Sequence, residues 1–168
     1  MLKLIILSGK SGNGKDTAAS IIKKIYSDKK CICVSYAYYL KDYLKRMGLY
    51  SEENKPRKLM QDYGNYLRNT MGNDFLIRRT LEDIKVFEKD YDVIIITDAR
   101  LEQEITVPLN IYPSAVTIRI IRPNYNNNLS IDEKNDVTEC NLDNYSDFKY
   151  TVINDENFED SLRRCLHE

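Results

Sequence analysis

A glycine-rich segment follows the first apolar run of the chain and leads directly into an amphipathic stretch. Residues 2–7 are apolar apart from Lys3, and the next residues read Ser-Gly-Lys-Ser-Gly-Asn-Gly-Lys, ending at Lys15. Glycine tolerates positive φ and has no Cβ, so such a loop brings its backbone close to an anion. The loop amides and the N-terminus of a following helix direct partial positive charge at that anion. The order of strand, loop, lysine and helix therefore predicts a phosphate-binding loop rather than an ordinary glycine-rich turn.

Short apolar runs alternate with segments of helical periodicity along the rest of the chain. The runs that predict strands are 2–7, 31–35, 93–97, 115–121 and 150–153. Helical spacing predicts helices over 16–27, 36–47, 56–71, 75–87 and 156–166, and the Asn-, Asp- and Ser-rich stretch 124–135 is typical of a mobile loop. Continuous apolar strands that alternate with helices are typical of parallel sheets covered on both faces. We therefore expect an α/β fold, a three-layer α/β/α sandwich around five parallel strands.

Length and charge limit the classes of protein to consider. The 168 residues fit a single domain, expected to span 1–168. Lys and Arg number 25 against 26 Asp and Glu, a balance that argues against a protein that binds nucleic-acid polymers. The apolar runs are far shorter than the roughly 20 residues of a membrane-spanning helix, and the first is too short for a signal peptide. We expect a cytoplasmic protein, a monomer or homodimer, that binds neither nucleic-acid polymers nor membranes.

The residue after Lys15 departs from the general phosphate-loop motif, in which Ser or Thr binds Mg²⁺. Asp16 occupies that position here, followed by Thr17, a candidate hydrogen-bond donor to an α-phosphate. A carboxylate binds Mg²⁺ directly or through water. The strand over 93–97 ends in another acid, Asp98, at the edge where ligands bind in open α/β sheets. Asp16 and Asp98 are therefore candidate metal ligands, and Lys15 is expected to reach the β- and γ-phosphates.

Two arginines follow neighbouring strands. Arg100 lies two residues beyond Asp98, and Arg122 ends the strand over 115–121. Catalysis of phosphoryl transfer consists mostly of positioning and of stabilising charge on the transferred group. Together with Lys15, these arginines are candidate catalytic residues. The alternative for each arginine is a solvated position on the surface.

A basic helical segment over about 36–90 is the candidate acceptor side of the site. It contains Lys41, Arg57, Gln61 and Arg68. The last three follow one another at intervals of four and seven residues, so one face of a helix can carry them all. This face suits an anionic acceptor, and the alternative is a solvated helix face.

Short motifs spread along nearly the whole chain carry a family resemblance. They are Leu7-Ser8-Gly9 with Gly14-Lys15-Asp16-Thr17, Arg57-Lys58-Leu59-Met60-Gln61 with Gly64 and Arg68, Asn73-Asp74-Phe75 with Arg78-Arg79, Thr97-Asp98-Ala99-Arg100, Thr138-Glu139 with Leu142, and Val152-Ile153-Asn154-Asp155. In these motifs the sequence resembles the phosphate-loop kinases that include the phage-type deoxynucleoside monophosphate kinases and the animal-type phosphomevalonate kinases.

The resemblance implies a P-loop NTPase fold of the nucleoside monophosphate kinase type, ATP as donor, Mg²⁺ as cofactor and a small-molecule phosphate acceptor that becomes a diphosphate. It implies that Lys15, Arg100 and Arg122 stabilise the transferring group. The residues it implies for ATP binding are Gly9, Lys10, Gly12, Asn13, Gly14, Lys15, Asp16, Thr17 and Asn154. Those expected to bind the acceptor substrate are Lys41, Arg57, Gln61, Arg68 and Arg100. From its composition and its position in the chain, the loop over about 123–140 is expected to act as a lid.

Three functions remain open. Residues 140–148 resemble the phosphomevalonate branch, whereas Gly-Lys-Asp-Thr and Arg122-Pro123 resemble the nucleotide branch. Both branches often carry a basic pair within the loop, where this chain has Ser11 and Gly12. We expect a (deoxy)nucleoside monophosphate kinase. The alternatives are a phosphomevalonate kinase-like enzyme of a small metabolite and a non-catalytic sensor that binds ATP.

Overall fold

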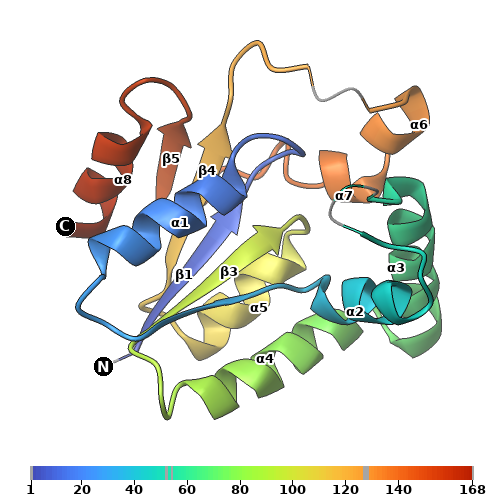
Figure 1. Cartoon of the computed structure of the whole chain (residues 1–168), viewed down its shortest axis with the longest axis horizontal. Coiled ribbons are helices and arrows are strands. Elements are labelled where there is room, and N and C mark those ends of the chain that lie inside the picture. The colour runs from blue at the N-terminus through green and yellow to red at the C-terminus, as the bar shows by residue number, and fades with distance from the viewer. Residues whose placement is uncertain (1, 52, 54, 127–128, 168) are drawn as a thin grey trace.

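The sheet in the computed structural model contains five parallel strands, as the apolar runs predict (Figure 1). The structure describes residues 2–51, 53, 55–126 and 129–167. The strands are β1 (Lys3–Ser8), β2 (Cys31–Val34), β3 (Val93–Ala99), β4 (Val116–Ile121) and β5 (Tyr150–Ile153). They pair in the order β2-β3-β1-β4-β5, with Ile5 of central β1 opposite Ile95 on one side and Val116 on the other. The predicted sheet is confirmed.

Helices cover both faces of this sheet and give the predicted three layers. Helices α1 (Lys15–Ile25) and α8 (Phe158–His167) pack on one face, and α4 (Phe75–Phe87) and α5 (Gln103–Ile111) pack on the other (Figure 1). Neighbouring residues of β3 enter different cores: Ile95 packs with α1 and α8, whereas Ile94 and Ile96 pack with α4 and α5. Burial on both faces explains why the strands are continuous apolar runs.

The remaining helices form two units on the side of the sheet where the strands end. They are α2 (Tyr38–Arg46), α3 (Arg57–Met71), α6 (Ile131–Lys134) and α7 (Val137–Cys140). The α2–α3 unit and the α6–α7 unit meet through two hydrogen bonds of α3, from Gln61 to the carbonyl of Glu133 (3.3 Å) and from Asn65 to Asp136 (3.3 Å). The longest of these helices, α3, has 15 residues. No helix in the described part of the chain has the length and apolar character needed to cross a membrane.

Part of the predicted mobile loop over 124–135 is helical. Ser130 begins α6 with a capping box: its side chain accepts a hydrogen bond from the amide of Glu133 (3.2 Å), and the Glu133 carboxylate accepts one from the amide of Ser130 (2.9 Å). A serine followed three residues later by glutamate is a sequence signal for a helix start. The loop prediction is therefore wrong over 131–134. Residues 127 and 128 of the same predicted loop lie outside the described residues.

Helix α5 has no counterpart among the predicted elements, because Pro108 lies in its middle. Proline has no amide hydrogen, so the carbonyl of Glu104, four residues earlier, loses its helical partner. The buried hydroxyl of Tyr36 donates to that carbonyl instead (2.6 Å). Parallel strands of one sheet need a crossover connection, which is usually a helix. The predicted strands over 93–97 and 115–121 could therefore have indicated a helix between them.

The turn from β3 into α5 depends on the side chain of Glu104. Its Oε2 accepts hydrogen bonds from the backbone amides of Arg100 (2.6 Å) and Leu101 (3.0 Å). The side chain is buried, and this burial raises the pKa of Glu104 to about 7, although the two amides act in the opposite direction. Glu104 thus fixes the backbone of Arg100, a predicted catalytic residue.

Replacing Glu104 by Gln should remove a pH-dependent contribution to the free energy of unfolding. The pKa of Glu104 is raised on folding from 4.5 to about 7, so between these values the folded protein holds a proton that the unfolded chain releases. The stabilisation is therefore complete at low pH and is lost as the pH rises through 7, with a slope of up to about 1.4 kcal/mol per pH unit. Urea unfolding of the wild type and of Glu104→Gln across this window measures the slope.

Glu102→Gln is the matched control, since it removes an exposed carboxylate from the same turn. The slope of the wild type should persist in this variant. A stability difference between wild type and Glu104→Gln that does not change with pH would contradict the raised pKa.

Candidate active site

One cavity of about 660 Å³ connects the phosphate loop, residues 9–15, with the acceptor-side helices α2 and α3. Most of the predicted site residues line it: Gly12, Gly14, Lys15, Asp16, Thr17, Lys41, Arg57, Gln61, Arg68, Asp98, Arg100, Arg122 and Asn154. Three of the residues predicted to bind ATP, Gly9, Lys10 and Asn13, do not line it. The structure therefore brings the donor and acceptor predictions together in a single space.

The glycines of the phosphate loop are required by the backbone and by close neighbours. Gly12 and Gly14 have φ of +80° and +98°, in the left-handed region that favours glycine. A Cβ on Gly12 would overlap the ring of Tyr125, and one on Gly14 would overlap the side-chain amide of Asn154. Gly14 is the N-cap of α1, so the loop ends at the positive end of that helix dipole.

Lys15 is the first residue of α1 and is buried at the base of the cavity. Its Nζ donates hydrogen bonds to the carbonyls of Gly9 (2.6 Å) and Lys10 (3.0 Å). Burial, and after it the charge of Arg100, lowers the pKa of Lys15 to about 7, while nearby carboxylates act in the opposite direction. A bound polyphosphate would supply the negative charge that this ammonium lacks.

The other predicted donor-side residues tie the loop to the sheet. Asn13 donates to the carbonyl of Ile120 in β4 (2.9 Å), and Asn154, just after β5, donates to the carbonyl of Asn13 (2.9 Å). The ammonium of Lys10 points away from the cavity to Asp143 (2.8 Å). These contacts hold the loop in place before any ligand binds.

Arg122 lines the predicted donor end of the cavity and lies next to Tyr125. Arg122 is exposed, and its guanidinium lies over the ring of Tyr125 at 4.4 Å from the ring centroid. The same ring contacts Gly12 of the phosphate loop. The chain that leaves β4 therefore contacts the phosphate loop at Tyr125.

The predicted acceptor end of the cavity combines cations with an apolar wall. Lys41, Lys55, Arg57 and Arg68 are the cations. The apolar and aromatic residues of the wall are Tyr36, Leu40, Tyr50, Met60 and Leu76. No sequence motif predicted a role for Tyr50, which lies just after α2.

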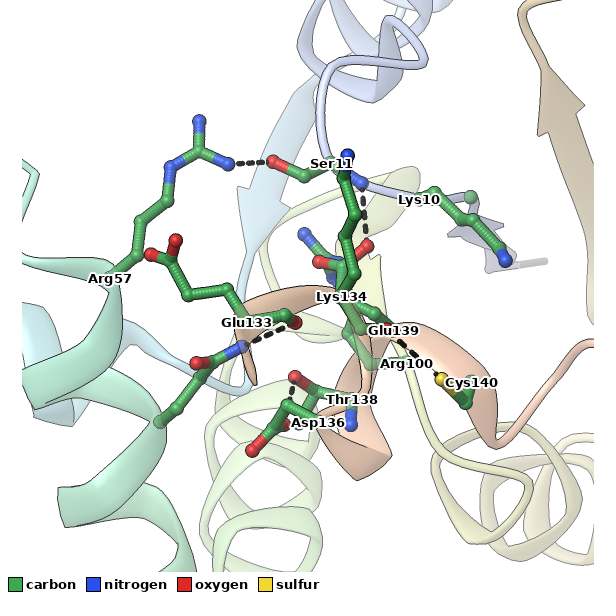
Figure 2. A network of polar contacts seen from close by, with 12 residues as sticks. Lys10, Ser11, Arg57, Arg100, Glu133, Lys134, Asp136, Thr138, Glu139 and Cys140 are labelled. Atoms are coloured by element: carbon green, nitrogen blue, oxygen red, sulfur yellow. Dashed lines mark hydrogen bonds and ion pairs between the residues drawn. The ribbon is translucent and has the colours of Figure 1, made fainter. Parts of the chain in front are cut away.

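The α6–α7 unit joins the phosphate loop, Arg100 and α3 through a network of polar contacts (Figure 2). Glu139 of α7 is buried, accepts a hydrogen bond from the amide of Ser11 (3.1 Å) and forms an ion pair with Arg100. The guanidinium of Arg57 donates to the hydroxyl of Ser11. No role for Glu139 emerged from the sequence, because its partners are distant in the chain and its helix has four residues.

The two predicted metal ligands differ in their surroundings. Asp98 accepts hydrogen bonds from the Ser35 hydroxyl (2.6 Å) and from the amides of Tyr36 (2.8 Å) and Ala37 (3.1 Å), so it anchors the turn after β2. Asp16 is exposed and lines the cavity. The described residues contain no cluster of three or more His, Cys, Asp or Glu that could hold a metal. Nucleotide-bound Mg²⁺ takes one or two carboxylates besides phosphates and water, and Asp16 fits that donor set.

No protein-family model matches the sequence, and no curated protein matches it. In three dimensions the chain is similar to shikimate kinase from Aquifex aeolicus, with 16% identity, a TM-score of 0.54 and coverage of 98% of this chain and 94% of that one. It is also similar to shikimate kinase from Bacteroides thetaiotaomicron, with 15% identity, a TM-score of 0.55 and coverage of 99% and 97%. The likeness extends over nearly the whole of each chain. The chain therefore has the phosphate-loop kinase fold of these two enzymes.

Proposed function

We propose that this protein is an ATP-dependent kinase that converts a nucleoside or deoxynucleoside monophosphate to the diphosphate. The observation that carries this proposal is the single cavity between the phosphate loop and the cations of the acceptor side. A donor triphosphate held at Lys15 and an anionic acceptor held by Arg57 and Arg68 would meet within it. Its volume of about 660 Å³ lies in the usual range of small-molecule sites.

The residues of the cavity suit phosphoryl transfer. An oxygen of the acceptor phosphate attacks the γ-phosphorus while the bond to the β-γ bridging oxygen breaks, which leaves ADP. The attacking oxygen is already ionised, so the step needs no general base. Lys15, Arg100 and Arg122 would balance the charge on the transferring group. Mg²⁺, when bound to the nucleotide near Asp16, would neutralise the β- and γ-oxygens.

The acceptor wall supports an acceptor that carries a base. Tyr36, Leu40, Tyr50 and Leu76 offer an apolar and aromatic surface. A nucleobase has a flat aromatic face that buries well against such a surface, whereas phosphomevalonate and shikimate contain no aromatic ring. Among the described residues, the buried Oε1 of Gln61 has no hydrogen-bond partner. A hydroxyl or amino group of the acceptor would supply the missing donor.

An ADP-release assay tests the proposal with Mg-ATP against all ribo- and deoxyribonucleoside monophosphates, phosphomevalonate, shikimate and a control without acceptor. Turnover confined to nucleotides supports the proposal and identifies the base. Turnover only with phosphomevalonate or only with shikimate would replace the proposed acceptor and keep the kinase reaction. ATP binding without turnover on any acceptor would favour a sensor.

Replacing Lys15 by Ala should lower kcat/KM by at least about 100-fold, because the ammonium contacts charge that develops in the transition state. The measurement is steady-state kinetics with the acceptor found above. Lys24→Ala, which removes an exposed lysine of the same helix outside the cavity, is the matched control. Equal rates for Lys15→Ala and Lys24→Ala would rule out the phosphate-loop reaction.

ATP binding should be coupled to proton uptake above neutral pH. The pKa of Lys15 is about 7 in the free protein, so most of its amine is neutral at about pH 8. The phosphates favour the ammonium, so ATP binding adds a proton and becomes weaker as the pH rises through and beyond 7. Isothermal titration calorimetry in two buffers of different ionisation enthalpy counts the protons. The same apparent enthalpy in both buffers, or the same uptake in Lys15→Ala, would contradict this coupling.

Arg57→Ala should raise the KM of the acceptor by about tenfold and lower kcat much less, because Arg57 is assigned to acceptor binding. Lys58→Ala is the control, since Lys58 is the neighbouring cation on α3, pairs with Asp62 and does not line the cavity. Initial rates at varied acceptor concentration separate the two constants. An unchanged acceptor KM in Arg57→Ala would remove Arg57 from the acceptor site.

A further inference from the structure

Glu139 brings a negative charge into a site built for anions. Its carboxylate is 9% exposed and lies between the phosphate loop and Arg100 (Figure 2). One oxygen accepts a hydrogen bond from the amide of Ser11 (3.1 Å), and the other forms the ion pair with the Arg100 guanidinium. Because the site is expected to bind polyphosphate, a buried carboxylate at this point needs a physical reason.

Attachment of the α6–α7 unit does not provide that reason. The residues that directly follow α7 already attach this unit to the rest of the molecule. Asp143 forms an ion pair with Lys10 (2.8 Å), and the carbonyl of Leu142 accepts a hydrogen bond from Arg119 (2.6 Å). The side chain of Leu142 is itself buried in the core beneath α4 and α5. A buried ion pair contributes little net stability, because desolvation of both charges offsets their attraction.

Arg100 provides the reason. Its backbone amide is fixed by Glu104 (2.6 Å), but its long side chain has several rotatable bonds between that anchor and the guanidinium. The ion pair with Glu139 selects one orientation of the guanidinium. A cation that is already aimed at the transferring group needs no reorganisation during the reaction.

We propose that Glu139 is a positioning residue: its carboxylate holds the guanidinium of Arg100 beside the phosphate loop, ready for the transferring phosphoryl group. The bond to the Ser11 amide fixes this carboxylate to the loop that holds the donor. The α6–α7 unit therefore completes the catalytic arrangement only when it is docked. This assignment rests on the proposed kinase function.

A double-mutant cycle between Glu139→Gln and Arg100→Ala tests the assignment. The Glu139→Gln substitution keeps one acceptor oxygen for the Ser11 amide and replaces the oxygen that pairs with Arg100 by an uncharged NH2 group, which cannot accept from the guanidinium. It should lower kcat by about 10- to 100-fold, with the KM of ATP and of the acceptor changed by less than about threefold, since the loss is one of positioning. In the Arg100→Ala background the same substitution should cost nothing further, because the group that Glu139 positions is gone. Glu139→Asp, which keeps the charge, should retain more activity than Glu139→Gln.

Asp143→Asn is the control for docking, since it removes the other ion pair between this part of the chain and the phosphate loop. It should leave kcat within about twofold of wild type, as expected for an exposed pair. Thermal unfolding of each variant verifies that it is folded.

The outcomes separate this inference from the proposed function. An unchanged kcat in Glu139→Gln, a loss confined to KM, or equal losses with and without Arg100 would overturn the role of Glu139 while the wild type remains an active kinase. A wild type that transfers phosphate to no acceptor would overturn the proposed function and, with it, this role.

Discussion

The ammonium of Lys15 is withdrawn from water at the point where β1, the phosphate loop and α1 meet, and the rest of the site is arranged around it. A buried cation needs compensating charge or it loses its proton. Two carbonyls of its own loop give only partial compensation, as the lowered pKa of Lys15 shows. Because β1 lies between β3 and β4, Arg100 and Arg122 approach from the two neighbouring strands. The site is thus short of negative charge, which a polyphosphate would provide.

Distant segments hold this centre in shape. The side chains of Asn13 and Asn154 tie the phosphate loop to the ends of β4 and β5. On the other side, Asp98 near the end of β3 accepts hydrogen bonds from the amides of Tyr36 and Ala37, in the turn before α2. One carboxylate therefore joins the end of β3 to the cavity wall that contains Tyr36. The sheet therefore sets the distance between the phosphate loop and helices α2 and α3, and side-chain hydrogen bonds set the local geometry.

Features that depend on neighbouring residues could be predicted from the sequence, and features that depend on distant contacts could not. The strands and the phosphate loop follow from apolar runs and from glycines next to Lys15, all of which are local patterns. Glu139 meets Ser11 across 128 positions of sequence, and nothing in its four-residue helix indicates that encounter. The orientation of Lys10 away from the cavity could not be predicted for the same reason, because its partner Asp143 is 133 positions away in the sequence. The start of helix α6, by contrast, could have been predicted from its capping box, the serine at 130 followed by the glutamate at 133.

Tyr36 lines the wall of the cavity and also contacts the backbone of α5. Its hydroxyl is committed to the carbonyl that Pro108 leaves without a partner. In a related chain with another residue in place of Pro108, a backbone amide would take over that carbonyl and release the hydroxyl. The wall would then gain a free polar group although none of its own residues had changed. Positions 36 and 108 are therefore expected to vary together during evolution, so the polarity of the cavity wall can depend on a residue that does not line the cavity.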